Sequence, residues 1–375
     1  MKKRIFLIIT RLDTGGSSEA VTAIKHGLAA KYDISIVSGP GEQTPDILIS
    51  DLQRDGSLLT DIKAFFELYT VLREHKPDIV HTNSSKAGFL GRLACLFAGI
   101  RNVVHMPHGH VFYGYDFGFI KESFFLALEI IMAPAARILI ALTNGEMKES
   151  LARGVGRKAQ WTVVHPGTEI PGRLPQARIE KRRELNISDS ALVIGTVARL
   201  EPVKGVLYLI KAFKLICEKY NGPLNLLIVG DGSLRAALET EAKALGIDGK
   251  CVFTGTRKDV YELMSAMDIF VQPSVNEGMG KTIIQAQASG LPVVASRVQG
   301  IPDALRENMT GLLVEAKNPG QISEAVMTLA HDPAKRGEMG KKAKEWAISP
   351  ENGLPRFGTA RMVFLIEKIY ENLLI

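Results

Sequence analysis

The sequence of 375 residues predicts an α/β protein with two doubly wound parallel sheets, one after the other. Short β-branched runs alternate with amphipathic helical stretches, a rhythm that favours parallel sheets covered by helices on both faces. The rhythm stops at a polar, proline-containing stretch and then restarts. The length also exceeds the roughly 100–200 residues of an ordinary domain, so two domains are expected.

Each half of the chain contains six runs that read as strands, and helical spacing of apolar residues lies between most of them. In the first half the runs are Arg4–Thr10, Ile34–Ser38, Ile79–Thr82, Val103–His105, Ile138–Leu142 and Thr162–His165. In the second half they are Val193–Val197, Leu226–Val229, Val252–Thr254, Ile269–Gln272, Val293–Ser296 and Gly311–Val314. Helices are predicted near Gln321–His331, Ala334–Ile348 and Arg356–Ile375, and the last is apolar on one face.

The domain boundary is predicted in the polar stretch after the sixth run, with a linker near Pro166–Pro175. A basic cluster lies in the same stretch and is interpreted as the exposed face of a short helix rather than as a binding patch. Its residues are Arg178, Lys181, Arg182 and Arg183. We expect an N-terminal domain over 1–170, a second domain over 171–356, and a last helix, 357–375, that packs back on the first domain. Doubly wound sheets bind ligands at the carboxyl ends of their strands, so two such units suggest a site in the cleft between them.

Composition narrows the classes of function. The first apolar run has only five residues, Ile5–Ile9, shorter than the roughly 7–15 of a secretory signal, so a buried strand is expected instead. Three cysteines without a CxxC pair fit a reducing cytoplasm and give no support to a structural metal. The net charge of +6 fits a solvated surface, an anionic membrane surface or an anionic small substrate. Nucleic acid is disfavoured because no basic run is interleaved with aromatic residues.

One motif places two cations between a strand and a helix. The segment Gly195–Gly205 carries Arg199 and Lys204 in the loop, and the next helix begins at Gly205. A planar guanidinium, a compact ammonium and a helix N-terminus together make a diphosphate site. We expect both side chains to be exposed. Two solvated cations in an ordinary loop are the simpler alternative, and this motif alone does not decide between them.

A second motif follows the strand that ends at Gln272. Glu277 precedes two glycines that permit close backbone approach, and a helix is predicted to start near Thr282. Free N–H groups at that helix start can cradle phosphate, while Glu277 can accept bonds from sugar hydroxyls. Gln285, on the first turns of the helix, can reach a ribose. A glycine-rich turn capped by a carboxylate is the alternative for the glycines.

These two segments resemble the retaining nucleotide-sugar glycosyltransferases of family 4, which have the GT-B fold of two facing Rossmann-like domains. That family has an Arg and a Lys after the first strand of its C-terminal domain, and two Glu separated by seven residues. Further matching segments are Val229–Arg235, Phe253–Val260, Gly300–Asp303, Thr310–Val314, Asp13–Gly16, Pro77–Thr82, Ser84–Gly88 and Pro107–His110. The resemblance covers roughly Arg4 to Val314.

The resemblance implies a role for each matching residue. Arg199 and Lys204 would bind the diphosphate, and Glu277 would hold hydroxyls of the donor sugar. His108 would contact the donor sugar near the reacting carbon, although a structural histidine is the alternative. Glycines of the first loop would let it approach the diphosphate from the opposite domain, and backbone groups of the Glu277 loop would bind sugar and phosphate. These residues are Gly15 and Gly16, and Gly278, Met279, Gly280, Lys281 and Thr282.

The resemblance also implies a retaining reaction that uses no metal or other cofactor, in which a departing phosphate oxygen takes the proton of the acceptor. UDP is favoured over GDP as the nucleotide. Two departures leave other functions open: Gln285 stands where the family has its second Glu, and Gln299 where it has a glycine. The alternatives are a nucleotide-sugar 2-epimerase and a weakly active nucleotide-sugar-binding protein. A dehydrogenase is less favoured because neither Gly15-Gly16 nor Gly230-Asp-Gly232 continues into the dinucleotide fingerprint.

An aromatic-rich window, Val111–Phe125, follows the His108 motif on the side where this family binds acceptors. Aromatic rings favour membrane interfaces, and Lys121 can meet anionic head groups, whereas packing in the domain core is the alternative. The hypothesis is a cytoplasmic enzyme at the inner face of the membrane that glycosylates a lipid-linked acceptor in surface polysaccharide synthesis. The aromatic residues are Phe112, Tyr113, Tyr115, Phe117, Phe119, Phe124 and Phe125.

Overall fold

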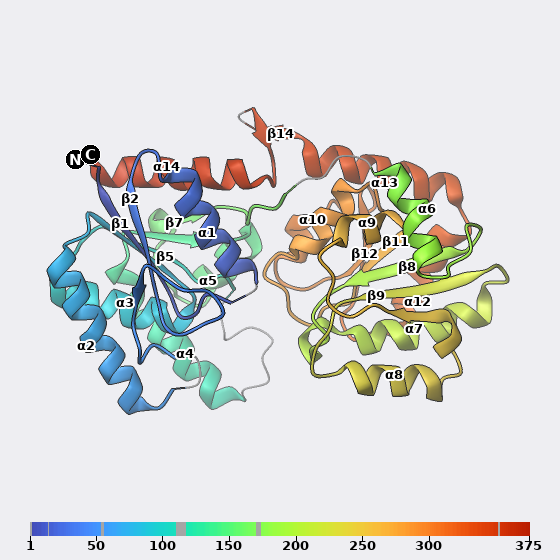
Figure 1. The fold of residues 1–375 in the computed structure, drawn as a ribbon, viewed down its shortest axis with the longest axis horizontal. Helices are drawn as coiled ribbons and strands as arrows, with labels where there is room; N and C mark the ends of the chain where they lie inside the picture. The colour runs from blue at the N-terminus through green and yellow to red at the C-terminus, as the bar shows by residue number, and fades with distance from the viewer. Residues whose placement is uncertain (1, 14, 54–55, 110–117, 170–173, 352) are drawn as a thin grey trace. The chain divides into compact units, whose positions relative to one another are not determined.

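The computed structural model describes residues 2–13, 15–53, 56–109, 118–169, 174–351 and 353–375, with the backbone alone at 119 and 175. The chain forms two compact units. Unit 1 comprises Met1–Gly167 and Thr359–Ile375, and unit 2 comprises Thr168–Gly358. Each unit is built on its own parallel sheet with helices on both faces (Figure 1), so the predicted α/β class with two doubly wound sheets is confirmed.

Unit 1 contains a seven-stranded sheet in the order β3-β2-β1-β4-β5-β6-β7, and all its strand pairs are parallel. The predicted runs all form strands, and the sequence analysis missed only the short β3. The strands are β1 (Arg4–Ile9), β2 (Asp33–Ser38), β3 (Ile47–Leu48), β4 (Ile79–Asn83), β5 (Val103–Met106), β6 (Ile138–Ala141) and β7 (Trp161–Val163).

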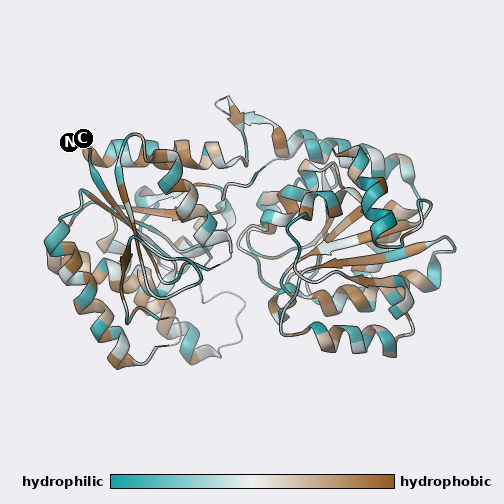
Figure 2. Cartoon of the chain, viewed as in Figure 1, coloured by the Kyte–Doolittle hydropathy of each residue, from teal (hydrophilic) through white to brown (hydrophobic). Residues whose placement is uncertain are grey.

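Alternation along β1 explains how helices cover both faces of this sheet. Phe6 and Ile8 point to one face and share a core with α2 and α3, whereas Ile5, Leu7 and Ile9 point to the other and pack with α1 and α14. The helices are α1 (Gly16–Leu28), α2 (Leu58–His75), α3 (Ser85–Ala98), α4 (Phe119–Met132), α5 (Asn144–Ala152) and α14 (Thr359–Leu374). Figure 2 shows largely brown strands between helices that alternate brown and teal.

The C-terminal helix α14 belongs to unit 1, as predicted. Its apolar face, which includes Ile366 and Tyr370, is buried against α1 and the sheet. The Tyr370 hydroxyl lies 2.7 Å from Nδ1 of His81 on β4. Burial lowers the pKa of His81 to about 3, an effect to which the charge of His108 adds, so this histidine is neutral at physiological pH.

Unit 2 contains a six-stranded parallel sheet in the order β10-β9-β8-β11-β12-β13. Its strands are β8 (Leu192–Val197), β9 (Leu224–Val229), β10 (Cys251–Phe253), β11 (Ile269–Gln272), β12 (Val293–Ser296) and β13 (Gly311–Val314). Its helices are α6 (Pro175–Glu184), α7 (Val206–Lys219), α8 (Arg235–Ala244), α9 (Val260–Ser265), α10 (Lys281–Ala288), α11 (Ile301–Ala304), α12 (Pro319–Ala330) and α13 (Pro333–Ile348). A short hairpin pairs β14 (Pro350–Glu351) with β15 (Leu354–Pro355).

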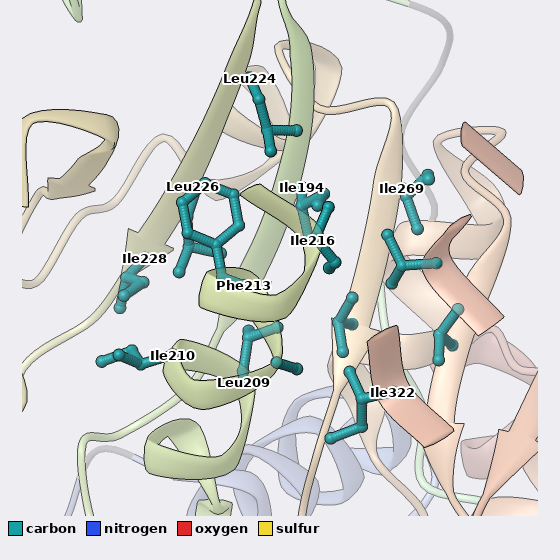
Figure 3. Packing of buried hydrophobic residues seen from close by; sticks show 14 of the residues in the cluster. Ile194, Leu209, Ile210, Phe213, Ile216, Leu224, Leu226, Ile228, Ile269 and Ile322 are labelled. Atoms are coloured by element: carbon teal, nitrogen blue, oxygen red, sulfur yellow. The ribbon is translucent and has the colours of Figure 1, made fainter. Parts of the chain in front are cut away.

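The sheet of unit 2 separates two apolar cores. On one face, Ile194, Leu226 and Ile228 pack against Phe213 and Ile216 of α7 (Figure 3). On the other, alternate residues of the same strands pack against α9, α10 and α13. The strands are therefore buried on both sides, as expected for a parallel sheet, and they form a rigid base for the loops at their carboxyl ends.

The basic cluster on α6 is exposed at Arg183, as the sequence suggested, but not at Arg182. The side chain of Arg182 is only 1% exposed. Its guanidinium donates to the carbonyls of Ala266, Ser188, Asp189 and Ala191 and pairs with Asp268 at 2.9 Å. A planar group with five donors can satisfy several acceptors at once, which allows burial of this charge beside the start of β11.

Candidate active site

In unit 2 the two predicted motifs lie side by side, because β8 and β11 are neighbours in the sheet. The loop after β8 contains the 3-10 helix η3 (Pro202–Lys204) and meets the loop after β11 through a bond from Val275 N–H to the carbonyl of Val203, 2.8 Å long. Gly205 permits this approach: its φ is +65°, and a Cβ there would lie 2.0 Å from the carbonyl oxygen of Pro273.

The two motifs are joined by an ion pair. Nζ of Lys204 lies 2.6 Å from Oε2 of Glu277, and the two side chains are only 19% and 14% exposed. The expectation that Lys204 is exposed was therefore wrong, because the Glu277 loop covers it. Arg199 is exposed on the same loop, as expected. A diphosphate that approaches this loop meets one solvated cation and one that is already paired.

Two buried polar side chains complete the surroundings of Glu277. Its Oε2 also accepts from Ser274 Oγ at 3.3 Å and from Gln272 Nε2 at 3.4 Å. Gln272 Nε2 donates to Ser274 Oγ at 2.7 Å, and Gln272 Oε1 accepts from Thr282 Oγ1 at 2.9 Å. The sequence analysis assigned no role to Gln272 or Ser274; their position directly after the strand was the only available signal.

The helix that follows begins at Lys281, close to the predicted start. Its N-cap residue, Gly280, has a φ of +77° and offers no side-chain cap. The Met279 side chain is buried in the core, so only its backbone can take part in binding. Gly278, Lys281 and Thr282 are half-buried. Backbone N–H groups of a helix start attract anions, which suits a phosphate at this point.

The two residues that depart from the family pattern have partners within unit 2. Gln285 Nε2 donates to the Tyr261 hydroxyl at 3.1 Å, and that hydroxyl donates to the carbonyl of Glu169. Gln299 has a φ of +32°, and its Oε1 accepts from the backbone N–H of Glu277 at 3.2 Å. Gln299 therefore occupies a backbone conformation that suits glycine, while its side chain supports the Glu277 loop.

In unit 1, His108 lies in a strained turn directly after β5. Its φ is +57°, uncommon for a residue with a side chain. Its Nε2 lies 2.9 Å from Oδ1 of Asn83, the last residue of the neighbouring strand β4. Asn83 Nδ2 donates to the carbonyl of His81, which directs Oδ1 toward His108. Because that oxygen only accepts, Nε2 of His108 carries a proton.

The loop after β1 reaches the same edge of the sheet. Thr10 Oγ1 lies 2.8 Å from Ser84 Oγ, and the N–H of Ser84 donates to Met106 of β5. Gly15 is the N-cap of α1, which starts at Gly16, and a Cβ at position 15 would meet no atom of the described residues within 4 Å, its chain neighbours aside. These contacts place the predicted glycine loop and the His108 turn at the carboxyl ends of β1 and β5, the two strands that flank β4.

A buried carboxyl group supports the His108 turn. Glu146 on α5 accepts from the N–H of Leu142 at 2.6 Å, and the N–H of Gly109 also bonds to it. Burial raises the pKa of Glu146 to about 7, although the two N–H groups oppose this shift. The residue next to His108 is thus held by a side chain that the sequence analysis missed. Within the described part of the chain, no three His, Cys, Asp or Glu side chains gather as metal ligands.

Comparisons with known proteins place this geometry in a family. A family model described as Glycosyltransferase Family 4 matches residues 14–170, and one described as Glycosyl transferases group 1 matches 177–346. An Escherichia coli relative named UDP-Gal:alpha-D-GlcNAc-diphosphoundecaprenol alpha-1,3-galactosyltransferase is 30% identical over 314 residues, which cover 80% of this chain and 81% of that protein. The chain belongs to the family 4 glycosyltransferases.

Two further similarities extend over most of this glycosyltransferase. The capsular polysaccharide biosynthesis glycosyltransferase CapM of Staphylococcus aureus is 26% identical over 325 residues, which cover 84% of this chain and 84% of that protein. The crystal structure of Anabaena Alr3699/HepE in complex with UDP and glucose superposes with a TM-score of 0.81 at 19% identity, over 99% of this chain and 100% of that one. The structural similarity confirms the GT-B architecture of two Rossmann-like domains.

Proposed function

We propose that this glycosyltransferase transfers a sugar from a UDP-sugar to a lipid-linked glycan acceptor, with retention of the anomeric configuration. The observation that supports it most directly is the Lys204–Glu277 contact of 2.6 Å. It places a cation suited to phosphate beside a carboxylate suited to sugar hydroxyls, next to an uncapped helix start. A nucleotide sugar has this sequence of groups: a diphosphate ester bonded to the anomeric carbon of a sugar.

Bond cleavage leaves negative charge on the diphosphate and positive charge on the sugar. Arg199, Lys204 and the start of α10 would stabilise the diphosphate, and each charged contact is worth roughly 2–4 kcal/mol in the transition state, by analogy with oxyanion donors. The three donors around Glu277 in unit 2 all bind Oε2. Oε1 can therefore accept from a sugar hydroxyl without loss of these bonds.

The acceptor oxygen forms the new bond to the anomeric carbon while the bond to the diphosphate breaks. The departing phosphate oxygen takes the proton of the acceptor, so no separate base and no metal or other cofactor is required. His108, whose Nε2 carries a proton, would contact the donor sugar near the reacting carbon. Gly15 and Gly16, which carry no side chains, would let the first loop approach the diphosphate.

UDP is the nucleotide we propose, since the Escherichia coli relative is named for UDP-Gal and the Anabaena protein was crystallised with UDP. The same relative is named for a diphosphoundecaprenol acceptor, and CapM for capsular polysaccharide biosynthesis. These names support a lipid-linked acceptor and a role in surface polysaccharide synthesis for this chain. We place the reaction in the cytoplasm, at the inner face of the membrane.

An exposed apolar surface on unit 1 supports the membrane contact. Among the described residues, ten of the sixteen exposed large apolar side chains lie on α2, α3 and α4, which pack in that order. Exposed apolar side chains on packed helices favour an interaction site, and the proposed lipid-linked acceptor argues for a bilayer as the partner. We call these residues the apolar face: Leu58, Leu59, Ile62, Phe66, Leu96, Phe97, Ile120, Phe124, Ile130 and Ile131.

The apolar face replaces the aromatic window Val111–Phe125 as the proposed membrane contact. Phe112, Tyr113, Tyr115 and Phe117 lie outside the described residues, as does the side chain of Phe119. Phe124 is exposed, as the membrane reading expects, but Phe125 is half-buried and packs against the core. Within the described residues, no helix has both the length and the apolar character needed to cross a bilayer. The proposed contact is therefore peripheral.

A donor screen tests the activity. Thermal unfolding is measured with UDP, GDP and their sugar conjugates, because a ligand that binds only the folded state raises its stability. The donor that binds is then supplied with a lipid-linked glycan. We expect stabilisation by UDP-sugars and UDP release that depends on the acceptor. Conversion of the donor without acceptor would reveal a 2-epimerase, and binding without turnover a nucleotide-sugar-binding protein.

Flotation with vesicles tests the membrane contact. Wild type should float with phosphatidylglycerol vesicles, and the double variant Phe97→Ser/Ile131→Ser should float less. The matched control, Ile179→Ser/Met309→Ser, changes two exposed apolar residues of unit 2 and should float like wild type. If wild type stays at the bottom of the gradient even at low salt, the membrane contact is wrong and a soluble acceptor is favoured.

A further inference from the structure

Gln272 is a fully engaged amide at the carboxyl end of β11. The residue is 1% exposed. Its Nε2 donates to Ser274 Oγ at 2.7 Å and to Glu277 Oε2 at 3.4 Å, and its Oε1 accepts from Thr282 Oγ1 at 2.9 Å. One side chain thus touches the carboxylate proposed to hold the sugar and the first turn of the helix proposed to bind phosphate.

The chemistry of these neighbours fixes the orientation of the amide. A carboxylate only accepts hydrogen bonds, so the NH₂ end of Gln272 faces Glu277. The carbonyl end then receives the hydroxyl proton of Thr282. A flipped amide would place its carbonyl oxygen against the carboxylate, and a buried polar group in that arrangement is unfavourable. The backbone of Gln272 is held by the sheet, because β11 pairs with β12 and Gln272 is in register with Ala295.

The Gln272 amide matters because the other strong partner of Glu277, Lys204, has a second proposed role. Lys204 binds the same oxygen, Oε2, but it is also a proposed ligand of the diphosphate. When a diphosphate draws Lys204 away, Gln272 and Ser274 still donate to Oε2 from within unit 2. Positioning of Glu277 then depends on the rigid strand rather than on a long, flexible lysine side chain.

We propose that Gln272 is a positioning residue, which holds Glu277 and Thr282 in one fixed arrangement so that sugar and phosphate are bound in register. This inference rests on the proposed function, because it assigns the two partners to the two halves of the donor. Gln272 itself touches neither substrate nor reacting atoms.

The test compares Gln272→Met with Gln287→Met. Gln287 is a matched control: it is also a buried glutamine of unit 2, with Nε2 bonded to the carbonyl of Ala304 at 2.7 Å, on the helix that follows the loop. Both variants remove a buried amide and keep its length. We expect similar losses in melting temperature. In Gln272→Met alone, kcat should fall about 10- to 100-fold, as expected for a misplaced binding group, while KM for the UDP-sugar changes little.

A second variant gives a readout that a purely structural role would not move. Gln272→Glu places a carboxylate against Glu277, and two adjacent carboxylates do not both ionise readily. At low pH the new carboxyl group is protonated and can still donate to Glu277, whereas at high pH both groups ionise and repel each other. The pH optimum of this variant should therefore lie below that of wild type. If Gln272→Met does not fold, Ser274→Ala, which removes one donor to Glu277, should still lower kcat more than the Gln287→Met control does.

The inference is overturned if Gln272→Met and Gln287→Met have the same kcat, or if Gln272→Glu keeps the pH profile of wild type. Failure of the proposed function looks different, because wild type itself would then neither bind a UDP-sugar nor release UDP in the donor screen. In that case the role of Gln272 falls with it.

Discussion

The ammonium group of Lys204 and the carboxylate of Glu277 are 2.6 Å apart, although the residues are separated by 73 positions in the sequence. This pair joins the loop after β8 to the loop after β11, and both side chains are mostly buried. A buried charge left without its partner is strongly destabilising, so each residue constrains the position of the other. Binding of a diphosphate would change which anion Lys204 contacts.

Lys204→Ala and Arg199→Ala should each lower turnover strongly. Each removes one charged phosphate contact, roughly 2–4 kcal/mol of transition-state stabilisation, or about 30- to 1,000-fold in rate. Lys214→Ala is the control, since Lys214 lies on α7 and pairs only with Glu218, at 3.3 Å, among the ion pairs found in unit 2. Initial rates of UDP release check the prediction. Rates close to wild type in both loop variants would exclude these residues from diphosphate binding.

Asn83→Leu should lower kcat with little change in KM for the donor. The variant removes the acceptor that holds Nε2 of His108, so the imidazole loses its orientation while the donor contacts in unit 2 remain. Asn83→Asp keeps an acceptor but adds a charge that favours the protonated imidazole, so its pH–rate profile should move to higher pH. Asn102→Leu is the control. Nδ2 of Asn102 donates to the carbonyl of Asp78, which lies just before β4, at the end of the strand opposite to Asn83. An unchanged kcat in Asn83→Leu would make His108 a structural histidine.

Gln285→Glu should change donor affinity by less than about tenfold and leave the reaction type unchanged, because an amide and a carboxylate can both accept from ribose hydroxyls. A carboxylate at 285 would also compete with the Glu169 carbonyl for the hydroxyl proton of Tyr261. Donor titration and initial rates of this one variant measure both effects. A large rise in turnover would instead identify the natural chain as a weakened enzyme.

Glu146 should make unit 1 less stable as the pH rises from about 5 to about 8. The pKa of its carboxyl is about 7 in the folded protein and 4.5 in the reference state, so between these values the folded state binds more protons. Stability then falls with rising pH, by up to roughly 3 kcal/mol for one group. Glu146→Gln, which cannot ionise, should gain stability relative to wild type over this range. Urea unfolding at both pH values measures the difference, and a pH-independent difference would contradict it.

The fold could be predicted because parallel strands leave a local signal. Runs such as Ile269–Gln272 and Val293–Ser296 are apolar on both faces, and the structure has these strands with the same bounds. Lys204 and Glu277 also lay within recognisable loops. The sequence could not reveal which distant side chains meet. Thr282 donates to Gln272 across a loop, and Asn83 and His108 meet at the ends of two neighbouring strands. The guanidinium of Arg182 donates to four backbone carbonyl groups.

Burial of polar side chains was the least predictable property. Lys204 and Arg182 both read as surface cations, yet one is covered by the Glu277 loop and the other lies within unit 2. Hydropathy assigns a charged residue to the surface, whereas partners supplied by the fold make its burial possible. Glu146 is a similar case, since its neighbours Leu142 and Gly109 are brought together only by the sheet.

The most direct test of retaining transfer from a UDP-sugar is the anomeric configuration of the product. The protein is incubated with an α-configured UDP-sugar and a lipid-linked glycan acceptor, and NMR coupling constants of the new linkage are measured together with UDP release. We expect an α-linked product, one UDP released per sugar transferred, and a strongly reduced rate in Lys204→Ala. A β-linked product, or sugar transfer by wild type and Lys204→Ala at equal rates, would contradict it.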